Sequence, residues 1–93
     1  MTEMEKLIKL LAEAKIPFKI RDCWGTLQVG YPNFDNLVCD AVCHSFSYGH
    51  EEGLLEIMGL VDEEEVGDSV EGYLTAEEVF ERIKTHYEAT KAD

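Results

Sequence analysis

Residues 18–44, FKIRDCWGTLQVGYPNFDNLVCDAVCH, decide the fold of this chain. Apolar and polar residues alternate along three parts of this stretch, over 18–21, 27–31 and 37–44. A period of two residues is typical of a strand with one buried face. Turn-forming residues separate the three runs, at 24–25 and at 32–35. Because the connections are short, the pattern predicts a three-stranded antiparallel sheet.

Helical patterns lie on both sides of these strands. Thr2 and Glu5 form a capping box ahead of an apolar stripe at helical spacing, and Thr75 and Glu78 form a second one. Residues 51–58 carry acids in their first turn and precede a glycine, which predicts a short helix between the sheet and the C-terminal helix. The expected fold is therefore α+β, in the order α-β-β-β-α-α, with the helices packed on one face of the sheet.

Length and composition limit the class of protein. The chain has 93 residues, of which 45% are hydrophobic, so we expect a single domain over residues 1–93. Twenty acidic and eight basic residues give a formal net charge of -12, which disfavours binding to nucleic acid or to an anionic membrane. No apolar run is long enough to span a bilayer. The first residues lack the pattern of a signal peptide, which indicates a cytoplasmic location.

The acidic residues concentrate in the second half of the chain. Residues 51–93 contain fourteen of the twenty acids, and the densest stretch is 62–71, DEEEVGDSVE. Such a one-sided charge indicates a surface that binds a basic partner, although solubility alone is an alternative explanation. The candidate partner-binding residues are Glu63, Glu64, Glu65, Asp68 and Glu71.

Cysteines and histidines supply a candidate metal site. Two thiolates and two imidazoles are a tetrahedral zinc set, here Cys23, Cys43, His44 and His50. If Tyr31 pairs with Asn36 around the turn, Cys23 lies opposite His44. The ion would be structural and would stabilise a small domain. Two buried cysteines with surface histidines are the alternative, and Cys39 in particular is expected to be a small buried hydrophobe.

Catalytic patterns are weak in this sequence. Cys43 and His44 are adjacent, so a regular strand would point them to opposite faces, away from the contact that a nucleophile and its base need. We therefore expect no enzyme activity. Aromatic side chains lie in or beside the turns, where they either fold back on the core or act as anchors for a protein partner. These aromatic residues are Trp24, Phe34, Phe46 and Tyr48.

Three segments carry a resemblance to a known group of proteins. They are CHSFSYG at 43–49, EGLLEIMG at 52–59 and YLTAEEVF at 73–80. The chain resembles short proteins of unassigned function encoded by phages and prophages of Gram-positive bacteria, and among these it is similar to anti-CRISPR proteins. The resemblance implies an inhibitor of a type II CRISPR effector nuclease, and zinc-containing members of that functional group would be similar.

The negative charge of the chain agrees with an inhibitor of such a nuclease. RNA-guided nucleases hold nucleic acid in positively charged channels, so an acidic protein can act as a DNA mimic and block DNA loading in the host cytoplasm without catalysis. Two other functions remain open. One is a small-ligand binding protein that sequesters a nucleotide signal, and the other is a small metalloenzyme with an open zinc position. The oligomeric state is also left open.

Overall fold

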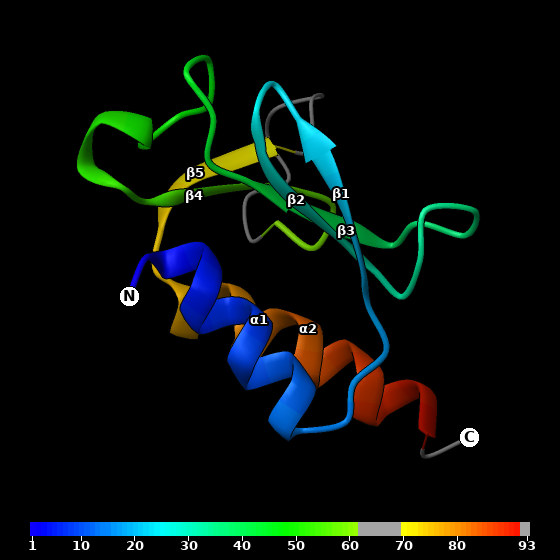
Figure 1. Cartoon of the computed structure of the whole chain (residues 1–93). Coiled ribbons are helices and arrows are strands. Elements are labelled where there is room, and N and C mark those ends of the chain that lie inside the picture. Colours follow the sequence, from blue (N-terminus) through cyan, green and yellow to red (C-terminus); the bar gives the residue numbers. More distant parts are fainter. Residues whose placement is uncertain (62–69, 92–93) are drawn as a thin grey trace.

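A five-stranded antiparallel sheet and two helices form the part of the chain that the computed structural model describes, residues 1–61 and 70–91 (Figure 1). The strands follow one another in the sheet in chain order, β1-β2-β3-β4-β5, so each neighbours the next. Helix α1 precedes the sheet and α2 follows it. The elements are α1 (Glu3–Glu13), β1 (Lys19–Cys23), β2 (Thr26–Tyr31), β3 (Cys39–Val42), a 3-10 turn (His50–Glu52), β4 (Leu55–Met58), β5 (Val70–Leu74) and α2 (Ala76–Lys91).

The predicted α+β class and the antiparallel pairing are confirmed, but the three-strand count and the α-β-β-β-α-α order are wrong. Residues 51–58 do not form the expected helix. Gly53 adopts a left-handed conformation, with φ 73°, which ends the 3-10 turn after three residues. Leu55 and Ile57 are then fully buried in the strand β4. Burial of every second side chain in the sheet therefore outweighs the acidic pattern that favoured a helix.

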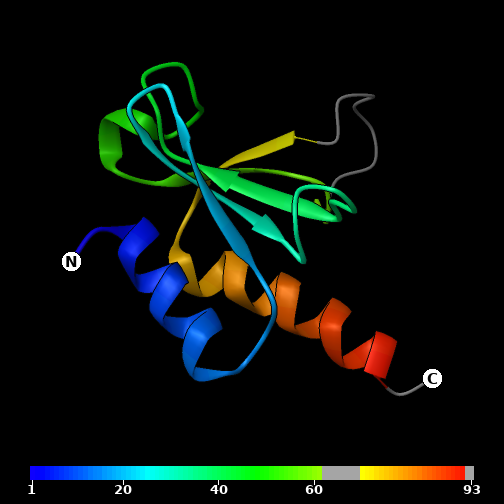
Figure 2. The same ribbon diagram turned by 45° about the vertical axis from the view of Figure 1, so that its right-hand side comes forward.

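Both helices cover the same face of the sheet and lie side by side (Figures 1 and 2). The apolar stripes of the two helices meet the alternating apolar residues of the strands in one core. Fully buried side chains of this core include Leu7, Leu11, Val29, Leu55, Ile57, Val79 and Ile83.

Within residues 1–61 and 70–91, no helix combines the length and the hydropathy needed to cross a membrane.

Both predicted capping boxes are confirmed. The Glu5 N–H donates to Thr2 Oγ1 at 3.1 Å, and the Thr2 N–H donates to Glu5 Oε1 at 2.7 Å. At the start of α2, the Thr75 N–H donates to Glu78 Oε1 at 2.9 Å, and the Glu78 N–H donates to Thr75 Oγ1 at 3.2 Å. Glu3 also accepts the Ala76 N–H at 2.7 Å, so the first turns of the two helices are joined directly.

The expected register between the second and third strands is wrong. Tyr31 pairs with Cys39 rather than with Asn36, so the loop between β2 and β3 is wider than the sequence suggested. The Asn33 side chain explains the wider loop, because its Oδ1 accepts the N–H groups of Asp35 and Asn36 at 3.0 Å and 2.7 Å. This local turn uses the Asn36 N–H that the tighter hairpin would need.

A polar ladder crosses the sheet face opposite the helices. Arg21 Nε donates to Gln28 Oε1 at 2.7 Å, and Gln28 Nε2 donates to Asp40 Oδ2 at 3.1 Å. Burial, which outweighs the hydrogen bonds from Gln28 and the Met58 backbone, raises the pKa of Asp40 above its usual value. The folded protein therefore holds this proton more tightly than the unfolded chain does.

Replacing Asp40 with asparagine is therefore expected to stabilise the protein near neutral pH. The contribution of Asp40 to stability is fully present below its unfolded pKa and is lost as the pH rises through its folded pKa. Asparagine keeps an acceptor for Gln28 and carries no charge. Urea unfolding across a pH series should show the gain at neutral pH and its disappearance in acid. The exposed Asp35→Asn should show neither, and a less stable Asp40→Asn at neutral pH would contradict this expectation.

Candidate protein-binding surface

Three segments meet at the end of the sheet that carries the β1–β2 turn. They are the turn at 24–25, the connection 43–54 between β3 and β4, and the end of β5 (Figure 1). Ring contacts join the first two segments, because Trp24 lies near His44 and Phe46. A backbone hydrogen bond joins the last two, from the Tyr73 N–H to the Tyr48 carbonyl at 3.3 Å. Segments distant in sequence therefore build one surface.

Three rings, which we call the ring cluster, stand on this surface: Trp24, His44 and Phe46. The centroids of Trp24 and Phe46 lie 5.4 Å apart at an interplanar angle of 73°, an edge-to-face contact. His44 lies 6.3 Å from Trp24 and 6.4 Å from Phe46. The side chains of Trp24 and Phe46 remain 70% and 74% exposed. The rings therefore contact one another and contribute little to the core.

The backbone at Trp24 is unusual for a bulky residue. Trp24 and Gly25 both have positive φ, 56° and 78°, as in the tight turn that matches the twist of a hairpin. Asparagine and glycine favour this conformation, whereas a bulky residue there costs about 1–3 kcal/mol. A strained and exposed tryptophan therefore points to a role for its side chain outside the folded core.

The loop that carries Phe46 is fixed by short-range hydrogen bonds. The Phe46 N–H donates to His44 Nδ1 at 3.1 Å. The His44 N–H donates to Ser47 Oγ at 3.0 Å, and Ser47 Oγ donates to the His44 carbonyl at 2.9 Å. Because these bonds hold the loop, the position of Phe46 in the ring cluster is set within the fold itself.

A pocket of about 230 Å³ adjoins the ring cluster. Tyr48 and Tyr73 line it with two exposed carboxylates, Glu51 and Glu52. The two tyrosines are 64% and 59% exposed. Gly72 allows this arrangement, because a side chain at that position would collide with Tyr48. We call these four residues the tyrosine–glutamate pocket.

The residues of the predicted zinc set are spread over this end of the molecule. Cys23 pairs with Thr26 in the β1–β2 hairpin, so the register that placed it opposite His44 is wrong. Cys43 is half-buried against the core, and His50 is exposed. Among residues 1–61 and 70–91, no three His, Cys, Asp or Glu side chains are grouped to hold a metal ion. Zinc binding through this set stays a prediction.

Burial also affects the cysteines. It raises the pKa of the Cys43 thiol, which disfavours the thiolate that a zinc ion needs. Cys39 is almost completely buried, and burial raises its pKa to about 12. The expectation that Cys39 is a small buried hydrophobe is confirmed.

The predicted acidic contact residues lie in two different settings. Glu63, Glu64, Glu65 and Asp68 lie outside the described residues. Glu71 lies in β5, and its two carboxylate oxygens accept from Arg82 Nη1 and Nη2 at 2.7 Å and 2.9 Å. The charge of Glu71 is therefore already compensated within the fold.

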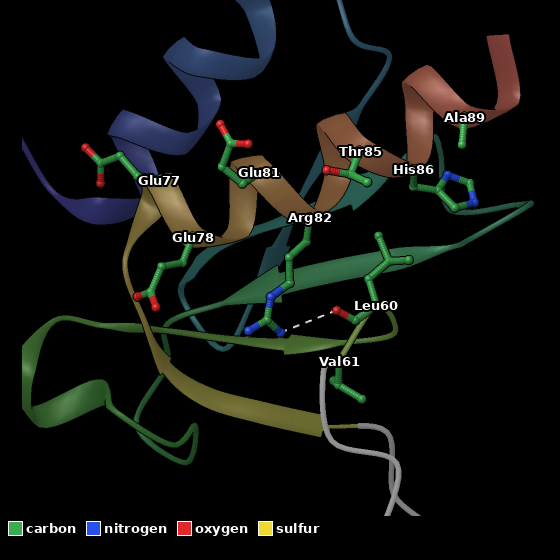
Figure 3. A pocket seen from close by; sticks show the side chains of 9 residues that line it. All are labelled: Leu60, Val61, Glu77, Glu78, Glu81, Arg82, Thr85, His86 and Ala89. Carbon is green, nitrogen blue, oxygen red and sulfur yellow. Dashed lines mark hydrogen bonds between the residues drawn. The ribbon is translucent and has the colours of Figure 1, made fainter. Parts of the chain in front are cut away.

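A shallow groove of about 760 Å³ runs along α2 on the side of Leu60 and Val61 (Figure 3). Glu77, Glu78 and Glu81 line it, and Arg82 Nη1 donates to the Leu60 carbonyl at 3.4 Å. Three carboxylates give this groove an acidic rim. Leu60 and Val61, which form one side of the groove, are the last described residues before 62–69.

The four aromatic residues that the sequence places in or beside turns have different environments in the structure. Phe34 folds back over Gly30 and carries the Arg21 guanidinium 4.0 Å from its centroid, whereas Trp24 and Phe46 face solvent. Tyr73 was missed as a surface residue because its strand was not predicted.

No protein-family model, curated protein or solved structure matches the chain.

Proposed function

We propose that this chain is a non-enzymatic binding protein that docks on a basic, nucleic-acid-binding surface of another protein. The partner that the sequence resemblance implies is a type II CRISPR effector nuclease, and the expected consequence is that DNA is kept from loading. The observation that carries the proposal is the ring cluster, in which Trp24 and Phe46 are exposed and held in place.

Exposed aromatic rings support a protein partner. Tryptophan and tyrosine dominate the binding energy of protein interfaces because they bury large area with few rotatable bonds. Trp24, Phe46, Tyr48 and Tyr73 all have more than half of their surface exposed. Phe34 shows the contrast, since its ring is used within the fold to cover Gly30.

The charge of the chain supports a basic partner. The formal net charge is -12, and exposed Glu51 and Glu52 lie beside the rings. All eight basic residues lie within the described ranges, where Lys6 and Arg82 are already paired with glutamates. A strongly negative protein is steered toward a positive channel and repels the DNA that would otherwise enter it. Occupying the channel is sufficient for inhibition, so no catalytic group is needed.

The acidic stretch at 62–71, which we call the acidic segment, offers a test of the proposal through neutralisation of three of its glutamates. The variant E63Q/E64Q/E65Q should bind the effector–guide complex about tenfold more weakly at low salt and show a flatter dependence on salt. Surface plasmon resonance against the complex measures both, and a DNA-cleavage assay reports inhibition. The control E13Q/D35N/E88Q removes the same charge from exposed positions elsewhere.

Two outcomes would contradict the proposal. The first is an absence of binding to the effector together with unaffected DNA cleavage, which would remove this partner. The second is an equal loss of affinity in the control variant, which would show that only the total charge matters and that the acidic segment makes no contact.

A further inference from the structure

The tyrosine–glutamate pocket combines two kinds of group that recognise the same ligand chemistry. We propose that it accepts an arginine side chain of the partner protein, with the guanidinium between the tyrosine rings and the two carboxylates. This inference rests on the proposed function, because it identifies how the surface would grip a basic partner.

Size is the first argument. The pocket volume is about 230 Å³, below the range of roughly 300–1,000 Å³ that is usual for small-molecule and cofactor sites. A pocket of this size suits one long side chain. It lies beside the exposed ring cluster, so a protein segment that covers Trp24 and Phe46 can reach it.

Chemistry is the second argument. Cations are attracted to the faces of tyrosine rings, and arginine makes this contact more often than lysine because its planar guanidinium is weakly hydrated. The same plane donates paired hydrogen bonds to a carboxylate. Tyr48 and Tyr73 offer the rings, and Glu51 and Glu52 offer the carboxylates. Arginine uses both groups at once, and its planar guanidinium suits them better than the compact ammonium of lysine does.

Rigidity is the third argument. The Tyr48 N–H donates to Glu56 Oε2 at 2.7 Å, and the Tyr48 carbonyl accepts the Tyr73 N–H at 3.3 Å. The 3-10 turn that carries the glutamates is held by the Gly49 carbonyl, which accepts the Glu52 N–H at 3.1 Å and the Leu54 N–H at 3.0 Å. The described walls of the pocket are therefore held in place by hydrogen bonds of their backbone groups.

A peptide titration followed by NMR tests the inference without the partner. The probe is an acetylated glycine peptide with one central arginine, and the same peptide with lysine or citrulline serves for comparison. The arginine peptide should shift amide signals of residues 45–52 and 73. Citrulline, which keeps the shape and removes the charge, should cause no saturable shift, and lysine should bind more weakly.

Variants then assign the contact. E51Q/E52Q should weaken binding of the arginine peptide about fivefold, and Tyr48→Ala should do the same while keeping the Cβ that packs on Gly72. The control E13Q/E88Q should bind as the wild type does. The inference is overturned if citrulline binds as well as arginine, if the shifts lie elsewhere, or if the control loses affinity equally.

Failure of this inference and failure of the proposed function give different results. If the effector binds with the expected salt dependence but the arginine peptide does not occupy the pocket, only the inference is wrong. If the peptide occupies the pocket but no effector is bound, the proposed partner is wrong and the arginine site stands.

Discussion

Replacing Trp24 with asparagine is expected to weaken binding of the partner protein by more than about thirtyfold while leaving the fold intact. Trp24 is 70% exposed and lies near both other rings of the ring cluster. Exposed tryptophans are frequent hot spots of protein interfaces, and their truncation to alanine typically removes about 2 kcal/mol or more of binding energy. Binding should fall mainly through faster dissociation.

The free energy of unfolding of Trp24→Asn should stay within about 1 kcal/mol of the wild type, because two effects oppose each other. Loss of the edge-to-face contact with Phe46 removes some stability. Asparagine, however, tolerates the positive φ of 56° at this position better than tryptophan does. The backbone strain at Trp24 is therefore expected to be relieved by the same change that weakens binding.

Surface plasmon resonance for binding and urea unfolding for stability check this prediction together. Leu37→Asn is a suitable control, since Leu37 is an exposed apolar side chain in the loop between β2 and β3 at the opposite end of the sheet. Retention of full affinity in Trp24→Asn would remove the ring cluster as the contact. A loss of several kcal/mol in unfolding would instead make Trp24 a structural residue.

Replacing Arg82 with alanine is expected to cost about 3 kcal/mol in the free energy of unfolding. Arg82 contacts both carboxylate oxygens of Glu71, and the side chains are only 15% and 28% exposed. Without the guanidinium, a mostly buried carboxylate in β5 loses its compensating charge. The pair also joins α2 to the edge of the sheet, so its loss should loosen that edge.

Urea unfolding of Arg82→Ala, Glu71→Ala and the double variant measures this effect and the coupling between the two residues. The double variant should recover part of the loss, because it removes both charges of the partly buried pair. Lys6→Ala is the control. It removes a pair with Glu3 in which the lysine is 42% exposed, and it should cost much less stability than Arg82→Ala does. If the losses in the free energy of unfolding of the two single variants simply add up in the double variant, the two residues are not coupled and the prediction is wrong.

This ion pair also affects how the predicted contact residues are to be tested. Reversing the charge of Glu71 would place a cation beside Arg82 and reduce stability, so a loss of binding in that variant would not report a contact. Changes at Glu63, Glu64 and Glu65 are therefore the better probes of the acidic segment. The same reasoning favours glutamine over lysine as the replacement.

Local signals in the sequence predicted the elements that local interactions determine. The capping boxes at Thr2 and Thr75 rest on contacts three residues apart, and both formed as expected. Residues 55–58 were predicted wrongly because their conformation depends on distant partners. Leu55 pairs with Leu74 and Ile57 with Glu71, in a strand that begins at the end of the acidic stretch 62–71. No local pattern at 51–58 contains that information.

The candidate site could be predicted only in part for a related reason. The position of aromatic residues in turns indicated either burial or partner contact, and only the folded chain shows that Phe34 covers Gly30 while Phe46 is exposed. The register that was expected to bring Cys23 opposite His44 is wrong. It depended on the width of one loop, which the Asn33 side chain widens through its own hydrogen bonds.

The hydrogen bond between Glu3 and the Ala76 N–H has a practical consequence for fusion proteins. It holds the beginning of α1 against the beginning of α2, three residues after Tyr73 of the tyrosine–glutamate pocket. A label or carrier attached ahead of Met1 would therefore crowd both this hydrogen bond and the pocket. Attachment after α2, which runs away from that end toward Lys91, leaves both accessible (Figures 1 and 2).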